Sequence, residues 1–273
     1  MFGEDKLKVI VRVRPEIPND AVQSRLHNVS NKICVHTYDD HMITIEKDPF
    51  HFRDFTFEEL LGAAASQEDA YVRSCQGIVE NFTRDGDDGC ILCYGQSGSG
   101  KTFTMFGDVS STATDSSFGL VQHGLRDIFT YIGNCQGANF EAIIYVSFYE
   151  IYLEKFRDLL APDTPISSLH QDVYSNTLSI REVPGKGACV EGLTRVQVTD
   201  FESGVKLIRE MKHKRTSKKR QSNSASSRSH AVLRITMEHV MITSQGKICI
   251  VYFCGNCIHF IIVSTLTSTS IDD

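Results

Sequence analysis

Apolar side chains recur at helical spacing in two long stretches of the chain. The first covers residues 66–82, begins with a capping serine and ends near Gly86. The second begins at Thr199 and Glu202, whose spacing predicts a capping box. Repeats of three and four residues place such side chains on one face of a helix, so both stretches are predicted to be helices that pack on a core. The apolar positions are Tyr71, Cys75, Ile78, Val79 and Phe82 in the first stretch, and Phe201, Val205, Ile208 and Met211 in the second.

Other segments have the pattern of strands. Residues 140–148 alternate between apolar and polar positions and are rich in β-branched and aromatic side chains, while residues 90–94 and 231–237 are short apolar runs. Gly133 and the Pro-Gly-Lys-Gly turn at residues 184–187 separate such elements. Strands that alternate with helices predict an α/β sandwich around a largely buried sheet.

Composition limits the class of protein. A chain of 273 residues with 41% hydrophobic residues, undivided by a Pro/Gly/Ser-rich linker, predicts one domain with one substantial core. A net charge of −6 and a pI near 5.9 argue against a general polyanion binder. Nine cysteines without a disulfide framework, and no N-terminal signal peptide, fit a reducing cytosolic interior.

A basic run near residues 212–220 is the local exception to the acidic balance. Three interpretations stay open: a solvated helix end, a contact with an acidic polymer surface, and a nuclear address. The basic residues are Lys212, Lys214, Arg215, Lys218, Lys219 and Arg220.

Two C-x-x-C pairs raise the question of a metal site. Cys90 and Cys93 lie in a predicted strand, where side chains alternate between faces and do not easily share a metal. Cys254 and Cys257, with His259, supply at most three ligands, whereas a closed zinc site needs four. No metal is predicted at either pair.

An eight-residue loop after the apolar run 90–94 has the pattern G-x-x-x-x-G-K-T. Glycines let the backbone fold around an anion so that several N–H groups point inward. In such a loop Lys101 reaches the β- and γ-phosphates and the Thr102 hydroxyl ligates Mg²⁺. The order of strand, loop and helix predicts a phosphate-binding loop made of Gly95, Gln96, Ser97, Gly98, Ser99, Gly100, Lys101 and Thr102.

A second polar segment, residues 223–230, precedes the strand-like run at 231–237 and packs four hydroxyls, an amide, a guanidinium and an imidazole into eight residues. Its pattern N-x-x-S-S-R-S-H resembles the switch I element of the kinesin motor family, and the sequence G-Q-S-G-S-G-K-T-F-T-M at 95–105 resembles that family's phosphate-binding loop. The similarity extends from residue 6 to residue 251 and includes the opening strand that ends in R-x-R-P at 12–15.

This resemblance implies a fold, a reaction and a set of site residues. The fold is a P-loop NTPase of the kinesin type, a three-layer α/β sandwich, and the ligands are ATP and Mg²⁺. The activity is ATP hydrolysis coupled to movement along microtubules, in the cytoplasm and on the cytoskeleton, without specific nucleic acid or membrane partners. By family likeness, Thr102 and Ser227 serve the metal, Arg12, Pro15 and Phe103 flank the adenine, and Asn223, Ser226 and Arg228 complete switch I.

The similarity stops within one strand. Residues 246–251 resemble the start of the family's switch II strand, but Tyr252 and Cys257 stand where that family has an aspartate and a glutamate. Without these acids Arg228 loses its carboxylate partner, and we expect hydrolysis to fall far more than nucleotide binding. The sequence therefore predicts a kinesin-like part at residues 1–251 and a divergent tail at 252–273. The tail is explained either by a truncated isoform or by a gene model that runs into noncoding sequence. In both cases we expect the chain to lack the family's main microtubule-binding elements.

The tail itself is uncharged from residue 248 to residue 271. Two alternatives to a motor stay open. One is a non-motile nucleotide-binding module, and the other, a weaker hypothesis based on the length of the uncharged tail, is a membrane-anchored nucleotide-binding protein. Pairing of residues 258–263 with the strand before the phosphate-binding loop is not expected. A parallel strand needs a crossover of roughly a dozen residues, and residues 254–257 are too few.

Overall fold

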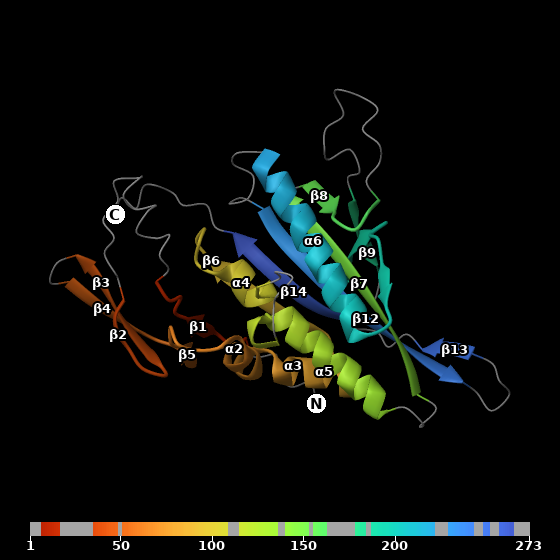
Figure 1. The fold of residues 1–273 in the computed structure, drawn as a ribbon, viewed down its shortest axis with the longest axis horizontal. Helices are drawn as coiled ribbons and strands as arrows, with labels where there is room; N and C mark the ends of the chain where they lie inside the picture. The colour runs from red at the N-terminus through yellow and green to blue at the C-terminus, as the bar shows by residue number, and fades with distance from the viewer. Residues whose placement is uncertain are drawn as a thin grey trace. The chain divides into compact units, whose positions relative to one another are not determined.

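The computed structural model describes residues 7–16, 35–48, 51–108, 115–135, 140–152, 155–162, 178–183, 187–221, 229–242, 248–251 and 257–264 (Figure 1). The chain forms two compact units, residues 1–70 and 71–273.

The first unit contains two small sheets. Strand β1 (Ile10–Arg12) pairs in parallel with β5 (Glu59–Leu61), and β2 (Val35–Tyr38), β3 (Met42–Asp48) and β4 (His51–Thr56) form an antiparallel sheet. Leu60 and Leu61 are buried, whereas every residue of β4 is exposed. Helix α2 (Gln67–Ser74) contains the boundary with the second unit.

The second unit has four further α-helices in the described ranges: α3 (Gln76–Arg84), α4 (Lys101–Phe106), α5 (Leu120–Asn134) and α6 (Phe201–Gln221), with a short 3₁₀ helix η1 (Asp115–Ser117). The helix predicted at 66–82 is present as α2 and α3, which meet at Cys75. Backbone bonds from Cys75 to Tyr71 and from Val79 to Cys75 continue the helical pattern through this point, so the predicted face is kept.

The sheet of the second unit has the order β11, β7, β12, β14, β6, with β8 paired to β7 and β13 paired to β12. The strands are β6 (Gly89–Gly95), β7 (Phe140–Tyr152), β8 (Lys155–Asp158), β11 (Val196–Val198), β12 (Ser229–Ile242), β13 (Ile248–Val251) and β14 (Cys257–Ser264). A separate hairpin joins β9 (Ser179–Val183) to β10 (Gly187–Glu191). The predicted strands at 90–94, 140–148 and 231–237 are confirmed.

The prediction that residues 258–263 would not pair with the strand before the phosphate-binding loop is wrong. Strand β14 lies parallel to β6, with Ile258 opposite Gly89 and Ser264 opposite Gly95. No crossover is needed, because β13 and β14 both pair antiparallel with β12 and follow each other along it. Strand β14 therefore continues along β12 on the side of β13, and its parallel partner β6 comes from much earlier in the sequence.

The described helices of this unit cover one face of the sheet, and Figure 1 shows α4, α5 and α6 in front of it. Ile91, Phe148, Leu233 and Phe260 point to this face and are buried beneath the helices. None of the helices that the structure describes is long and apolar enough to cross a membrane, and the described parts of the uncharged tail are strands.

Candidate nucleotide-binding site

The candidate loop lies between the end of β6 and the start of α4. Gly95, Gly98 and Gly100 have φ angles of 152°, 80° and 96°, a region that glycine adopts at little cost and other residues rarely do. A Cβ atom built on Gly95 would also lie 2.7 Å from the Ser99 Oγ. The backbone path of the loop therefore favours glycine at all three positions, the two of the sequence pattern and Gly98 between them.

Lys101 lies against this loop. Its Nζ donates to the carbonyl oxygens of Gly95, at 2.8 Å, and of Gln96, at 2.6 Å. Burial lowers the pKa of the Lys101 ammonium, and the nearby charge of Arg215 lowers it further. The ammonium is thus held at the loop, where a phosphate would be a better partner than two neutral carbonyls.

Thr102 faces a small cavity behind the loop. The cavity has a volume of about 20 Å³ and lies between α4, β7 and α6. Lys212 donates from Nζ to the Gly107 carbonyl at 2.9 Å and so joins α6 to the end of α4. The residues that line the cavity are Thr102, Phe106, Phe148, Ile208, Met211, Lys212 and Arg215.

A buried polar cluster beside this cavity was not predicted from the sequence. The Ser229 hydroxyl donates to Oε1 of Glu150 at 2.6 Å, and Nε of Arg215 lies 3.5 Å from the same oxygen. The side chain of Arg215 is only 6% exposed, and burial lowers its pKa. The interpretation of the basic run as a solvated helix end is therefore wrong for Arg215. Its spacing from Ile208 and Met211 was the available signal, since positions 208, 211 and 215 share one helical face.

The other predicted site residues are placed as follows. Gln96, Ser97, Gly98 and Ser99 are exposed in the loop, and Phe103, predicted to flank the adenine, has 51% of its surface exposed. In the first unit, Arg12 donates to Oε1 of Gln67 at 2.6 Å and to the Ala65 carbonyl at 3.3 Å, while Pro15 is exposed. The switch I residues Asn223, Ser226, Ser227 and Arg228 lie outside the described residues, as do Tyr252 and Cys254.

The carboxyl end of β14 reaches the same edge of the sheet as the loop. Because β6 and β14 are parallel neighbours, Ser264 is opposite Gly95, the first loop residue. Ligands of open α/β sheets bind at the carboxyl ends of parallel strands. Strand β14 brings no acidic residue to this edge. Within the described ranges, no group of three His, Cys, Asp or Glu side chains is arranged to hold a metal ion.

Comparison with known proteins identifies the family. The family model of the kinesin motor domain matches residues 12–257. A kinesin-like protein of Caenorhabditis elegans, klp-20, is 31% identical over 263 residues, which are 94% of this chain and 37% of that protein. The kinesin heavy chain of Doryteuthis pealeii is 32% identical over 246 residues, 90% of this chain and 23% of the relative.

A solved structure shows the same fold. The structure of a fast kinesin, whose title refers to its ATPase mechanism and its interactions with microtubules, aligns with a TM-score of 0.75 at 24% identity. The alignment covers 97% of this chain and 68% of that one. The α/β fold of kinesin type that the sequence predicted is thereby confirmed, and the chain belongs to the kinesin motor domain family.

Proposed function

We propose that this chain binds ATP with Mg²⁺ through residues 95–102 and acts as the motor domain of an ATP-dependent microtubule motor. The observation that carries the proposal is the loop itself: three glycines with positive φ and an ammonium held against the loop carbonyls. This arrangement fits the phosphates of a nucleotide. Membership of the kinesin family, whose motor domains bind nucleotide, supports the same ligand.

In this proposal, the predicted site residues have distinct tasks. Lys101 exchanges the carbonyls of Gly95 and Gln96 for the β- and γ-phosphates, and the Thr102 hydroxyl ligates the metal together with Ser227. The bound Mg²⁺ would neutralise phosphate charge. Arg12, Pro15 and Phe103 flank the base, and Asn223, Ser226 and Arg228 respond to the last phosphate.

We infer that hydrolysis is weak relative to binding. Phosphoryl transfer depends on positioned metal, water and charge, and the two switch II acids of the family have no counterpart at Tyr252 and Cys257. Residues 252–273 are the part that departs from the motor sequence in this proposal, although the family match continues to residue 257. The chain spans 37% or less of the two relatives described above, so movement along microtubules is proposed for the full-length protein.

The test is nucleotide affinity of the purified chain, measured with fluorescent ATP and ADP in the presence and absence of Mg²⁺. We expect Lys101→Ala to weaken MgATP binding by about a hundredfold, because a charge-assisted contact to phosphate is lost. Thr102→Ala should remove most of the dependence on Mg²⁺. Lys206→Ala, an exposed change on α6, is the matched control and should bind like the parent chain. If the folded parent chain shows no affinity for either nucleotide, the proposal fails.

A second measurement tests the motor assignment. Co-sedimentation with microtubules and steady-state ATPase with and without them separate a motor from a non-motile nucleotide-binding module. We expect nucleotide binding with low ATPase. Strong microtubule-stimulated hydrolysis by this chain would contradict the inference drawn from the missing acids.

A further inference from the structure

Arg215 is a buried cation that its carboxylate neighbour, Glu150, satisfies only in part. Its Nε lies 3.5 Å from Oε1 of Glu150, a long contact, and that oxygen already accepts the Ser229 hydroxyl at 2.6 Å. Its Nη1 is buried and has no hydrogen-bond partner within the part of the chain that the structure describes. A guanidinium carries five donors, so a single shared carboxylate oxygen satisfies only part of it.

The position of Arg215 links this charge to the phosphate-binding loop. Arg215 and Thr102 line the same cavity of about 20 Å³, although they come from α6 and α4. The charge of Arg215 also acts on the loop lysine, since it contributes to the lowered pKa of Lys101. Because the Arg215 side chain is only 6% exposed, solvent screens its charge less than it screens a surface charge.

We propose that Arg215 is a positioning residue that sets the preference of the loop for the more highly charged nucleotide, with Glu150 moderating its charge. This inference rests on the proposed nucleotide site and deepens it, since it assigns part of the choice between triphosphate and diphosphate to a residue behind the loop. Arg215 acts on the phosphates through space, as a fixed charge, and not by contact. Glu150 sets the opposite bias and also holds Ser229, the first residue of β12.

Two substitutions should then change nucleotide preference in opposite directions. Arg215→Met removes the cation, so it should lower the affinity ratio of ATP to ADP by roughly threefold to tenfold. Glu150→Gln removes the moderating charge but keeps an oxygen that can accept the Ser229 hydroxyl, so it should raise the ratio. Arg215→Lys keeps a cation and should restore most of the preference.

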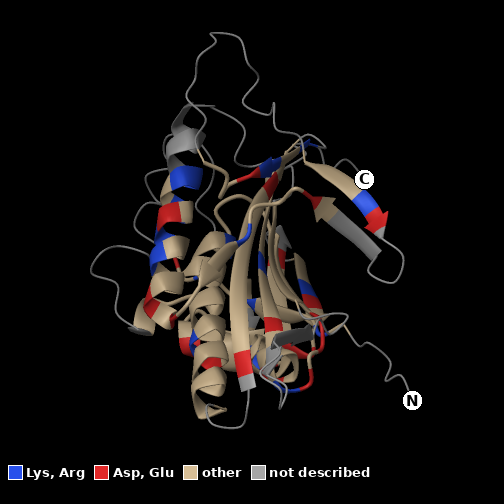
Figure 2. Ribbon diagram, turned by 90° about the vertical axis from the view of Figure 1, so that its right-hand side faces the viewer, with Lys and Arg blue, Asp and Glu red and all other residues tan. Residues whose placement is uncertain are grey.

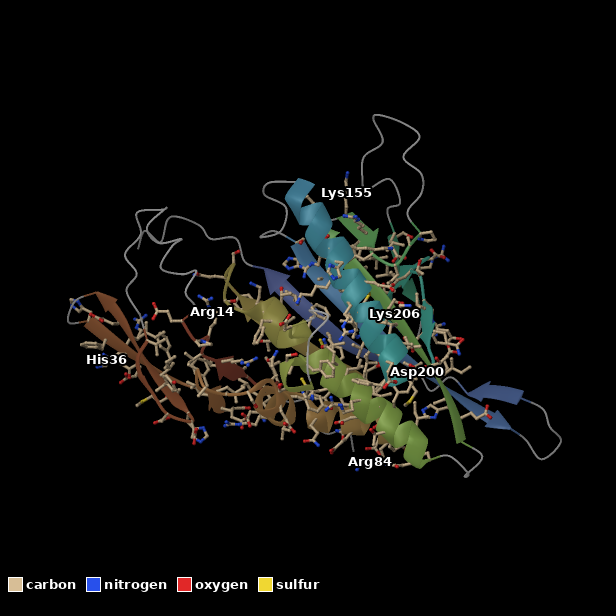
Figure 3. The ribbon with its side chains drawn as sticks, in the orientation of Figure 1. Arg14, His36, Arg84, Lys155, Asp200 and Lys206 are labelled. Carbon is tan, nitrogen blue, oxygen red and sulfur yellow. The ribbon has the colours of Figure 1, made fainter. Side chains whose placement is uncertain are left out.

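The matched control is Lys206→Met, which makes the same change of charge on the same helix but at an exposed position, labelled in Figure 3. It should leave the ratio unchanged, because exposed charges are screened by water and salt. Affinities for fluorescent ATP and ADP, with cooperative thermal unfolding as the check on folding, supply all the readouts. If Arg215→Met does not fold, the affinity ratios of Glu150→Gln and Arg215→Lys still test the proposal.

The outcomes are distinguishable. Two results would overturn this inference: equal affinity ratios of ATP to ADP in all folded variants, or shifts of Arg215→Met and Glu150→Gln in the same direction. Either result would show that Arg215 only packs α6 against β7, and the proposed nucleotide site would still stand. A parent chain that binds neither nucleotide would overturn both. Opposite shifts, with rescue by lysine, are the expected result.

Discussion

The two faces of the seven-stranded sheet differ in what holds them together. On the face beneath the helices, Phe148, Leu233 and Phe260 are at most 1% exposed. On the opposite face, Leu92 and Tyr94 of the same β6 strand are 54% and 69% exposed. Figure 2, turned by 90°, shows helices gathered on one side of the long strands.

The opposite face, here called the polar face, contains hydrogen-bonded and charged pairs beside buried apolar side chains such as Val232. Asp88 accepts from the backbone N–H of Cys257 at 2.9 Å and from its Sγ at 3.1 Å, and burial raises the pKa of that thiol to about 12. Farther along, Glu238 pairs with Arg195, whose guanidinium lies 4.1 Å from the centre of the Tyr145 ring. We infer that most of the stabilisation by apolar burial comes from the helix-covered face, which also contains the cavity beside Thr102.

The largest expected effect tests whether β14 belongs to the covered core. Phe260→Ala removes a fully buried ring at the centre of the sheet, so we expect the free energy of unfolding to fall by about 3–5 kcal/mol. Leu92→Ala, on the exposed face of the neighbouring strand, is the control and should change it by less than about 0.5 kcal/mol. Urea unfolding followed by circular dichroism measures both.

A small effect of Phe260→Ala, equal to that of Leu92→Ala, would mean that the tail does not lie in the sheet. The comparison of the two faces would then hold only for β6, β7 and β12. A large effect would show that residues 257–264 contribute to folding even though they depart from the motor motif.

The next effect concerns the polar face. Glu238 is only 5% exposed and pairs with Arg195, whose side chain is 44% exposed, so Glu238→Gln removes a buried charge from a pair that is half open to solvent. We expect a loss of about 1–3 kcal/mol in the free energy of unfolding. The same substitution at Glu191, which pairs with Arg181 at 3.4 Å on the surface, should cost less than about 0.5 kcal/mol. Equal losses in the two variants would show that burial adds nothing to the Glu238 pair.

Local patterns were enough to predict much of the covered face. The helical repeat that includes Val205, Ile208 and Met211 belongs to α6, and all three side chains are buried. The backbone path of residues 95–102 was also predictable, because Gly95, Gly98 and Gly100 adopt positive φ angles that favour glycine. Both signals lie within a few consecutive residues.

What could not be predicted depended on partners distant in the sequence. The pairing of β14 with β6 joins residues about 170 positions apart, and nothing local in 257–264 indicates which strand it meets. The sequence placed Arg215 in a basic run whose interpretation stayed open between a solvated helix end, an acidic partner surface and a nuclear address. Its environment in the structure comes from Glu150 on β7 and Thr102 on α4. Charge in a linear run does not reveal which member faces the core.

The smallest effect is a dependence of stability on pH that arises on the polar face. Burial lowers the pKa of His259, on β14, and the charge of Arg234 lowers it further, while Asp88 opposes them. The unfolded chain therefore takes up a proton at this histidine more readily than the folded protein does. Stability should accordingly fall as the pH drops below about 6.5, with a slope of at most about 1.4 kcal/mol per pH unit from this one group.

Thermal unfolding between pH 7.5 and pH 5.5, as test conditions, should show a smaller loss of stability on acidification for His259→Asn than for the parent chain. Glu80→Gln on the exposed side of α3 serves as a control that keeps the histidine. An unchanged acid slope in His259→Asn would mean that His259 is protonated in the folded sheet as easily as in water, and the polar face would then be more open to solvent than its hydrogen bonds indicate.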